Sequence, residues 1–189
     1  PTQVRVGSEH SREGGQLIDV DEVILHENFD YMYSYDVALL KLSKPIKFGK
    51  TAKPVKIATK EGKNGSTVVL SGYGYNNVEG MKDDNGDLTQ GKQNVVARAT
   101  CQNSYSSPIL DESNSCTQSS TVCGCYSDFG SPIVQKNKLL GWFIGGTYCC
   151  VNSAPQIFSN APTIAKWAKD KMKSGGYREG ENHGFYYEE

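Results

Sequence analysis

The stretch that most constrains the fold runs from Cys123 to Val134 and reads Cys-Gly-Cys-Tyr-Ser-Asp-Phe-Gly-Ser-Pro-Ile-Val. Its two cysteines, two glycines and proline are typical of a tight, pinned loop. The apolar residues after Pro132 are typical of the start of a strand. The chain must therefore hold a cross-linked loop directly before a strand.

Composition narrows the class of protein. The chain has 189 residues and a net charge of −1, which allows one large domain or two small ones and gives no indication of a nucleic-acid partner. No run of about 18 apolar residues occurs, so no membrane span is predicted. The chain opens on a strand-like sequence, so we expect no signal peptide in it, although a secreted protein would have lost one.

The cysteines indicate the compartment. Their number, six, is even, so we expect three disulfides. His10, His26 and His183 are scattered, and no Cys-x-x-Cys pair occurs, which disfavours a zinc site. We therefore expect no metal, no cofactor and an oxidising environment, which makes the protein secreted and extracellular.

Alternating and apolar runs predict a series of strands followed by a C-terminal helix. The helix begins at Pro162, and its apolar face consists of Ile164, Trp167, Ala168 and Met172. A polar loop is expected at 76–93, a helical turn at 102–105 and disorder from residue 174. The expected strands are 2–6, 16–25, 35–42, 67–75, 94–99, 139–146 and 154–158.

Residues 43–63 form a lysine-rich connecting segment. Between positions 41 and 63 lie eight lysines and one acidic residue, Glu61, which gives a local charge of +7. Pro45 and Pro54 exclude one continuous helix, so we expect an extended crossing segment. Such lysines either form a solvated surface or attract acidic proteins or sulfated glycans. The candidate binding residues are Lys47, Lys50, Lys53 and Lys56.

Two short motifs lie in expected loops. Asn64-Gly65-Ser66 is an N-glycosylation sequon, and Asn64 is a candidate acceptor in a secreted protein. The acidic cluster at 83–87 suggests calcium, but Met81 and Lys92 would fall at required ligand positions of an EF-hand. We therefore expect no metal in this loop.

Several strings resemble those of the trypsin and chymotrypsin family of serine proteases. They are residues 35–42, 67–75, 123–134 and 141–149, and they follow one another in the family's order. The resemblance covers about residues 3–172 and implies an all-β, two-barrel chymotrypsin-like fold with a C-terminal helix, its first barrel incomplete at the N-terminus. Within the family, the chain most resembles mite digestive trypsins and the inactivated protease paralogues of the scabies mite. The implied domains are 1–42 (part of the first β-barrel), 43–63 (interdomain linker), 64–161 (second β-barrel), 162–173 (helix) and 174–189 (flexible tail).

The resemblance also assigns the catalytic positions, and most of them are altered. Asp36 matches the triad aspartate. Phe129 stands at the nucleophilic serine, and a benzyl group has no oxygen that could attack a carbonyl. Ser127 replaces the first oxyanion glycine, whose backbone geometry a residue with a Cβ resists. The triad histidine would precede residue 1, and none of the three histidines matches it, so we expect no enzyme activity.

The substrate pocket departs from the family as well. Cys123 stands at the pocket base, where trypsins carry an aspartate, and Gln156 replaces a glycine of the pocket wall. Ile144 replaces a serine that helps to hold the triad aspartate, and Gly145 replaces a tryptophan of the substrate shelf. Ser8 stands at the first acidic ligand of the family's calcium loop, so no calcium is expected there.

The resemblance selects one disulfide pairing among the many that six cysteines allow. Two pairs match bridges of the family, and the remaining pair would be an extra bridge that tethers the pocket base to its wall. The implied bridges are Cys101–Cys116, Cys125–Cys149 and Cys123–Cys150. The crossed alternative, Cys123–Cys149 with Cys125–Cys150, would keep the tether.

Different functions are compatible with these residues. The first is a pseudoprotease that binds a protein partner, and the resemblance to the scabies mite paralogues implies interference with host complement or proteolytic cascades. The second is a hydrolase with relocated catalytic residues, for instance Ser127 or Ser131, which would need a new base and a new oxyanion hole. The third is a relic without a defined partner.

Overall fold

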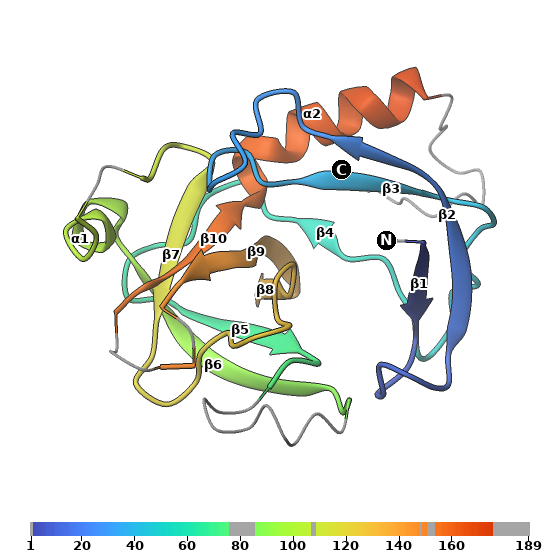
Figure 1. The fold of residues 1–189 in the computed structure, drawn as a ribbon, viewed down its shortest axis with the longest axis horizontal. Helices are drawn as coiled ribbons and strands as arrows, with labels where there is room; N and C mark the ends of the chain where they lie inside the picture. The colour runs from blue at the N-terminus through green and yellow to red at the C-terminus, as the bar shows by residue number, and fades with distance from the viewer. Residues whose placement is uncertain (1, 76–85, 107–108, 148, 151–153, 176–189) are drawn as a thin grey trace.

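The computed structural model describes residues 2–75, 86–106, 109–147, 149–150 and 154–175, which form a mostly-β molecule (Figure 1). Its elements in chain order are β1 (Gln3–Val6), β2 (Gln16–Leu25), β3 (Ala38–Leu42), β4 (Lys56–Ile57), β5 (Thr67–Gly72), β6 (Thr89–Val96), α1 (Arg98–Gln102), β7 (Asn114–Gln118), β8 (Pro132–Gln135), β9 (Lys138–Gly146), β10 (Gln156–Asn160) and α2 (Ala161–Ser174).

Six antiparallel strands close a barrel in the order β10-β7-β6-β5-β8-β9, because β10 also pairs with β9. Successive residues of a strand point to opposite faces. Val68 and Leu70 on β5, Ile133 on β8 and Phe143 on β9 therefore point inward, and all are buried in one apolar cluster. Short β4 adds to the barrel edge, parallel to β9.

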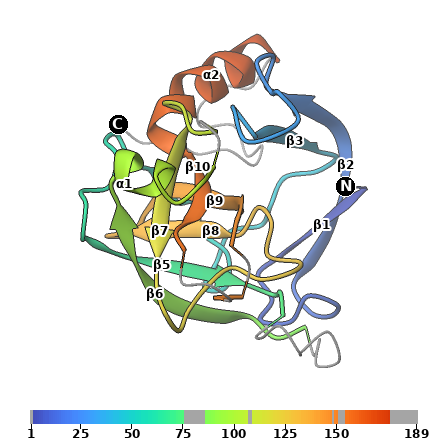
Figure 2. The ribbon, with the colours of Figure 1, turned by 60° about the vertical axis from the view of Figure 1, so that its left-hand side comes forward.

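The second sheet is smaller. It contains β1, β2 and β3 in that order, all antiparallel, and it lies beside the barrel in both views (Figure 1, Figure 2). The chain leaves β3 at Leu42, passes along β4 and enters the barrel at β5. This arrangement confirms the expected all-β fold with an incomplete first barrel and a C-terminal helix. The predicted domain boundaries stay predictions.

Helix α2 packs its apolar stripe against the molecule. Pro162 lies in the first turn, where its missing N–H group costs nothing. Ile164, Ala168 and Met172 are buried, as their spacing predicts. Trp167 is only partly buried, because its ring lies against His26 rather than in the core. No helix of the described residues is long and apolar enough to cross a membrane.

The sequence misplaced several elements. Strand β6 begins at Thr89, inside the predicted loop 76–93, and the predicted strand 94–99 gives way to α1 at Arg98. The polar string of β6 becomes a strand because it pairs with β5 on one side and with β7 on the other, so tertiary pairing outweighs local propensity. Residues 76–85 and the predicted disordered part 176–189 lie outside the described residues.

Candidate functional site

Two neighbouring disulfides pin the loop at the start of residues 123–134. Cys123 bonds to Cys150 and Cys125 bonds to Cys149, so the loop is tied twice to the chain that follows β9. The third bridge, Cys101–Cys116, joins α1 to β7. These are the three pairs that the resemblance implies, and the crossed alternative does not occur.

Gln156 closes the space between the pinned loop and the end of β9. The residue is 2% exposed. Its Oε1 accepts hydrogen bonds from the N–H of Gly124 (2.7 Å) and from Nε2 of Gln93 (2.9 Å). Its Nε2 donates to the carbonyl oxygens of Gly124 (2.8 Å) and Thr147 (2.6 Å). All four hydrogen-bonding positions of the amide are therefore used.

Gln93 extends this arrangement, although its polar stretch of sequence does not mark it as a site residue. It is buried on β6, and its Nε2 also donates to the carbonyl oxygen of Val122 (2.8 Å). Its Oε1 accepts from the hydroxyl of Thr117 (2.5 Å). The spacing to Val95 could have indicated its burial. Gln93 lies two residues before Val95, so both side chains point to the inward face of β6.

Phe129 lies at the tip of the pinned loop. Its ring is 54% exposed and stacks on Phe143, with the ring centroids 5.6 Å apart. Gly130 follows with a φ of 83°, and its N–H donates to the carbonyl oxygen of Phe143 (2.8 Å). The loop thus presents an aromatic ring, which offers no nucleophilic atom.

Asp128 holds the loop from inside. Its carboxylate accepts hydrogen bonds from the N–H groups of Cys125 (3.0 Å) and Gly74 (2.9 Å) and from the hydroxyl of Ser131 (3.5 Å). Burial raises the pKa of Asp128, and the three donors act in the opposite direction. Ser127, next to it, is exposed and has a φ of 68°, a conformation that few non-glycine residues adopt.

Asp36 lies just before β3 and shares a cavity with Phe129. The cavity has a volume of about 790 Å³ and is lined by β3, β4, β9 and α2, mostly through apolar side chains. The backbone carbonyl of Asp36 accepts hydrogen bonds from Nε1 of Trp142 and from the hydroxyl of Ser159, both at 2.8 Å. Burial, together with the charge of Asp30, raises the pKa of the Asp36 carboxyl.

Tyr33 fills the position beside Gly145, and the sequence did not identify it. A Cβ on Gly145 would lie 2.6 Å from Cε1 of Tyr33, so no larger residue fits there without a shift of that ring. Ile144, the preceding residue, is buried with Ile157, and Tyr33 and Trp142 pack against them. This side of the candidate site is therefore apolar and closed.

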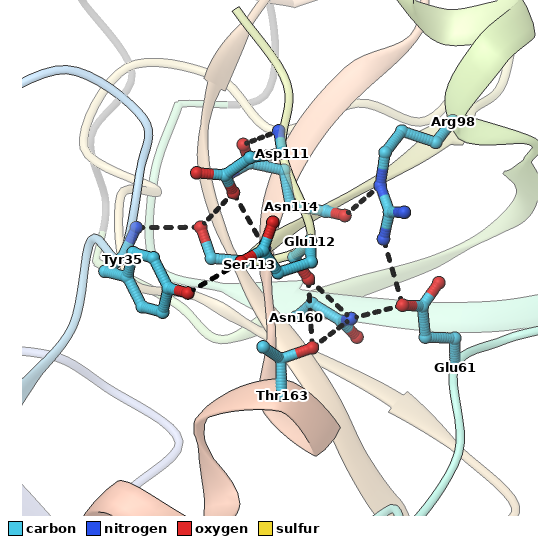
Figure 3. Close-up of polar contacts among 9 residues, drawn as sticks. All are labelled: Tyr35, Glu61, Arg98, Asp111, Glu112, Ser113, Asn114, Asn160 and Thr163. Carbon is cyan, nitrogen blue, oxygen red and sulfur yellow. Dashed lines mark hydrogen bonds and ion pairs between the residues drawn. The ribbon is translucent and has the colours of Figure 1, made fainter. Parts of the chain in front are cut away.

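A polar network fixes the residues just before Asp36 to the barrel (Figure 3). The N–H of Tyr35 donates to the hydroxyl of Ser113 (2.8 Å), and its phenol donates to Oε1 of Glu112 (2.9 Å). The hydrogen bond to Glu112 raises the pKa of Tyr35. Nδ2 of Asn114 donates to the carbonyl oxygen of Tyr33 (2.7 Å). The segment before β3 is thus fixed to the segment before β7.

The same network continues to the end of the lysine-rich segment. Nδ2 of Asn160, which is fully buried, donates to Oε1 of Glu61 (2.8 Å), and Arg98 forms an ion pair with Glu61 at 2.9 Å (Figure 3). Asn160 also lies 2.9 Å from the hydroxyl of Thr163 at the start of α2. Glu61 therefore binds groups of the barrel rather than the lysines around it.

His26 begins a turn in which the N–H of Phe29 donates to its carbonyl oxygen (3.1 Å), but its side chain does not lie on the surface. It is buried, and its ring stacks between Tyr35 and Trp167, with centroid distances of 4.6 Å to each. Desolvation lowers the pKa of His26. Trp167 of α2 covers this ring. His10 accepts a hydrogen bond from the N–H of Arg12 at its Nδ1 (3.1 Å).

We expect the contact between α2 and the turn after β2 to weaken in acid. Glu27 accepts a hydrogen bond from Nε1 of Trp167 (2.6 Å) and pairs with Lys171, which lowers the pKa of Glu27 from 4.5 to about 2. Its stabilising effect is therefore complete above pH 4.5 and lost as the pH falls towards 2. Tryptophan fluorescence against pH should show this transition, and Glu27→Gln should lack it. An identical transition in both proteins would contradict the assignment, because His26 titrates in both.

The remaining predicted residues lie on the surface. Asn64 is exposed in a turn, and its Oδ1 accepts a hydrogen bond from the N–H of Ala97 (2.9 Å). Glycosylation of Asn64 stays a prediction. The four candidate binding lysines of the segment 43–63 are all exposed. Among the described residues, no group of three or more His, Cys, Asp or Glu side chains could hold a metal ion.

The barrel, the partial second sheet and the pinned loop define the class of protein: the fold is that of the chymotrypsin-like serine proteases. The family model described as Trypsin matches residues 1–168. The chain therefore belongs to the trypsin family.

Relatives are distant. Trypsin iota of Drosophila melanogaster is 27% identical over 169 residues, which cover 87% of this chain and 66% of the relative. Hypodermin-B of Hypoderma lineatum is 29% identical over 178 residues, 91% of this chain and 68% of the relative. The chain thus spans about two thirds of the length of these relatives.

Solved structures agree with the fold. Mouse neuropsin, a serine protease, has a TM-score of 0.80 at 23% identity and covers 90% of this chain and 78% of its own. The scabies mite inactivated protease paralogue S-I1 has a TM-score of 0.77 at 28% identity and covers 90% of this chain and 76% of its own. At 23% identity, the similarity to neuropsin shows the fold alone.

Proposed function

We propose that this trypsin-family chain is catalytically inactive and acts by binding a protein. The observation that carries the proposal is Phe129: the pinned loop presents a phenyl ring to the cavity that Asp36 also lines. The family mechanism needs a hydroxyl at this point and a base within hydrogen-bonding distance of it. The likeness to an inactivated mite paralogue supports the same conclusion.

The closed pocket supports it independently. The amide of Gln156 bonds to both Gly124 and Thr147, and it uses the polar groups that a substrate would need. Cys123 at the pocket base is bonded to Cys150 and supplies no charge. A Lys or Arg side chain of a substrate would find neither space nor a counter-ion, and an unpaired buried charge is costly.

A hydrolase with relocated residues is the alternative, and the geometry disfavours it. The hydroxyl of Ser131 lies 3.5 Å from Asp128, whose carboxylate also accepts the N–H groups of Cys125 and Gly74 and so holds the loop. A hydrolase would also need an oxyanion hole for Ser131. Ser127 is exposed, has a φ of 68° and stands where the family carries the oxyanion glycine. Its use as a nucleophile would therefore need a different oxyanion hole. A relic without a partner is the other alternative, and only a binding experiment separates it from a pseudoprotease.

The partner that we propose is a protein outside the cell. Three disulfides in a trypsin-family chain support secretion. The resemblance to the mite paralogues makes host complement components the first partners to test. A pull-down from host plasma with the intact protein, with trypsin inhibited at its serine as the matched control, should retain a protein that the control does not. Retention of nothing beyond the control would favour a relic.

We expect Phe129→Ser to restore no turnover. Gln156, Ser127 and the Cys123–Cys150 bridge still obstruct the site, so hydrolysis of peptide substrates should stay at least about 10⁴-fold below that of trypsin. Labelling by a fluorophosphonate, with trypsin in parallel, measures the same point directly. Turnover in this single variant would mean that the pocket is open, and it would overturn the proposal.

A further inference from the structure

The lysine-rich segment does not stand alone on the surface. Strand β4 pairs in parallel with β9, and this register makes Lys56 the direct partner of Lys138. The N–H of Ala58 donates to the carbonyl oxygen of Leu139 (2.8 Å), which fixes the pairing at its far end. Lysines from two distant parts of the sequence thus meet at one edge of the barrel.

The hairpin between β8 and β9 supplies a further lysine. Gln135 pairs with Lys138, so Lys136 and Asn137 form a two-residue turn, and their φ values are 48° and 60°. Two residues with positive φ are typical of a type I′ turn, which matches the twist of a hairpin. Lys136 and Lys138 are both exposed. We call the four candidate binding lysines of the segment, together with the two lysines of the hairpin, the lysine track: Lys47, Lys50, Lys53, Lys56, Lys136 and Lys138.

The charge of the track is not neutralised by the acid within its own segment. Glu61 is engaged by Arg98 and by Asn160 (Figure 3). The segment 41–63 carries +7 in a chain of −1, so the remaining residues sum to −8. Like charges directly opposite on neighbouring strands, as at Lys56 and Lys138, destabilise each other.

We propose that the lysine track binds a sulfated glycan chain. The lysines follow an extended segment instead of surrounding an apolar centre, and its two exposed large apolar residues, Phe48 and Val55, are separated in sequence. A protein partner needs buried aromatic or apolar anchors, whereas a linear polyanion is held by charges distributed along its length. The proposal goes beyond the proposed function, because it requires neither a protein partner nor loss of catalysis.

Heparin serves as the probe, and its binding to the intact protein is measured by surface plasmon resonance between 50 and about 300 mM salt. The first variant combines Lys47→Ser, Lys50→Ser, Lys53→Ser and Lys56→Ser. The second combines Lys136→Ser and Lys138→Ser. The matched control combines Lys92→Ser and Lys166→Ser, which remove the same charge as the second variant from exposed positions on β6 and α2.

We expect both track variants to bind heparin about tenfold more weakly and with a smaller dependence on salt, because fewer counterions are released. The control should change by less than about twofold, and polyglutamate should bind more weakly than heparin. Circular dichroism verifies that the exposed substitutions leave the fold intact. An equal loss of heparin affinity in the control would mean that the net charge of the protein, and not the position of the lysines, determines binding. That result, tighter binding of polyglutamate, or no heparin binding by the unaltered protein at about 150 mM salt would each overturn the proposal.

Discussion

Gln156→Ala is expected to lower the free energy of unfolding by about 3–5 kcal/mol. The substitution leaves the N–H of Gly124 and the carbonyl oxygen of Thr147 without their partner. It also removes one hydrogen bond from Gln93 and one from the carbonyl oxygen of Gly124, which keeps its bond to the N–H of Cys149 (3.0 Å). Each buried polar group that loses its partner costs about 1–3 kcal/mol, and water entering the space offsets part of this cost. Urea denaturation, with the slope checked for constancy, measures the change.

Gln90→Ala provides the matched control. Gln90 also lies on a strand of the barrel, but its side chain is exposed, so the free energy of unfolding should change by no more than about 0.5 kcal/mol. Equal stability of the two variants would show that the amide of Gln156 does not hold the pocket closed.

Removing the extra bridge is expected to have a smaller effect. The bond between Cys123 and Cys150 has a sequence separation of 27, and the neighbouring Cys125–Cys149 bond, with a separation of 24, lies inside it. Replacing Cys123 and Cys150 by serine should cost about 2 kcal/mol of stability, because the remaining bridge still closes nearly the same loop and the unfolded chain regains only a little freedom. Calorimetry under non-reducing conditions measures the loss. No change in the unfolding temperature would mean that the bridge does not form in solution.

The two predictions are coupled, since Gln156 and the bridge join the same two walls. In the variant without the bridge, Gln156→Ala should cost less than in the unaltered protein, by about 1 kcal/mol or more. The double variant of Cys101 and Cys116, a bridge that joins α1 to β7 instead, is the control, and there the cost of Gln156→Ala should stay the same. Additivity in both backgrounds would contradict a shared role at the pocket.

The loop at 123–134 could be predicted from the sequence, because its cysteines, glycines and proline lie within one stretch before an apolar run. The assignment of Phe129, Asp36 and Gln156 to the candidate site, and the pairing of the cysteines, depended on the family resemblance. Gln93, the partner of Gln156, was missed, because a glutamine in a polar string looks exposed until the register of β6 turns it inward.

Other misses have the same origin in tertiary contacts. His26 follows a strand in a polar stretch, and nothing near it in the sequence indicates that Trp167 of α2 covers its ring. Tyr33 lies in a turn, and its contact with Gly145 joins residues more than a hundred positions apart. Pairing with β5 and β7 also makes β6 a strand, where local propensity favoured a loop. The helix α1 likewise replaces the end of a predicted strand.

The amide network of Gln156 has an evolutionary consequence. An ancestor with an open pocket would carry glycine at this position, and the present amide now satisfies groups on two walls and on Gln93. Reversion to glycine would expose those groups before it restored any cleavage, since Phe129 and the Cys123–Cys150 bridge would still be in place. In a catalytically inactive chain of the kind proposed above, each single step back would lose stability without a gain in activity. The contacts of Gln156 would therefore oppose a return of the lineage to protease function.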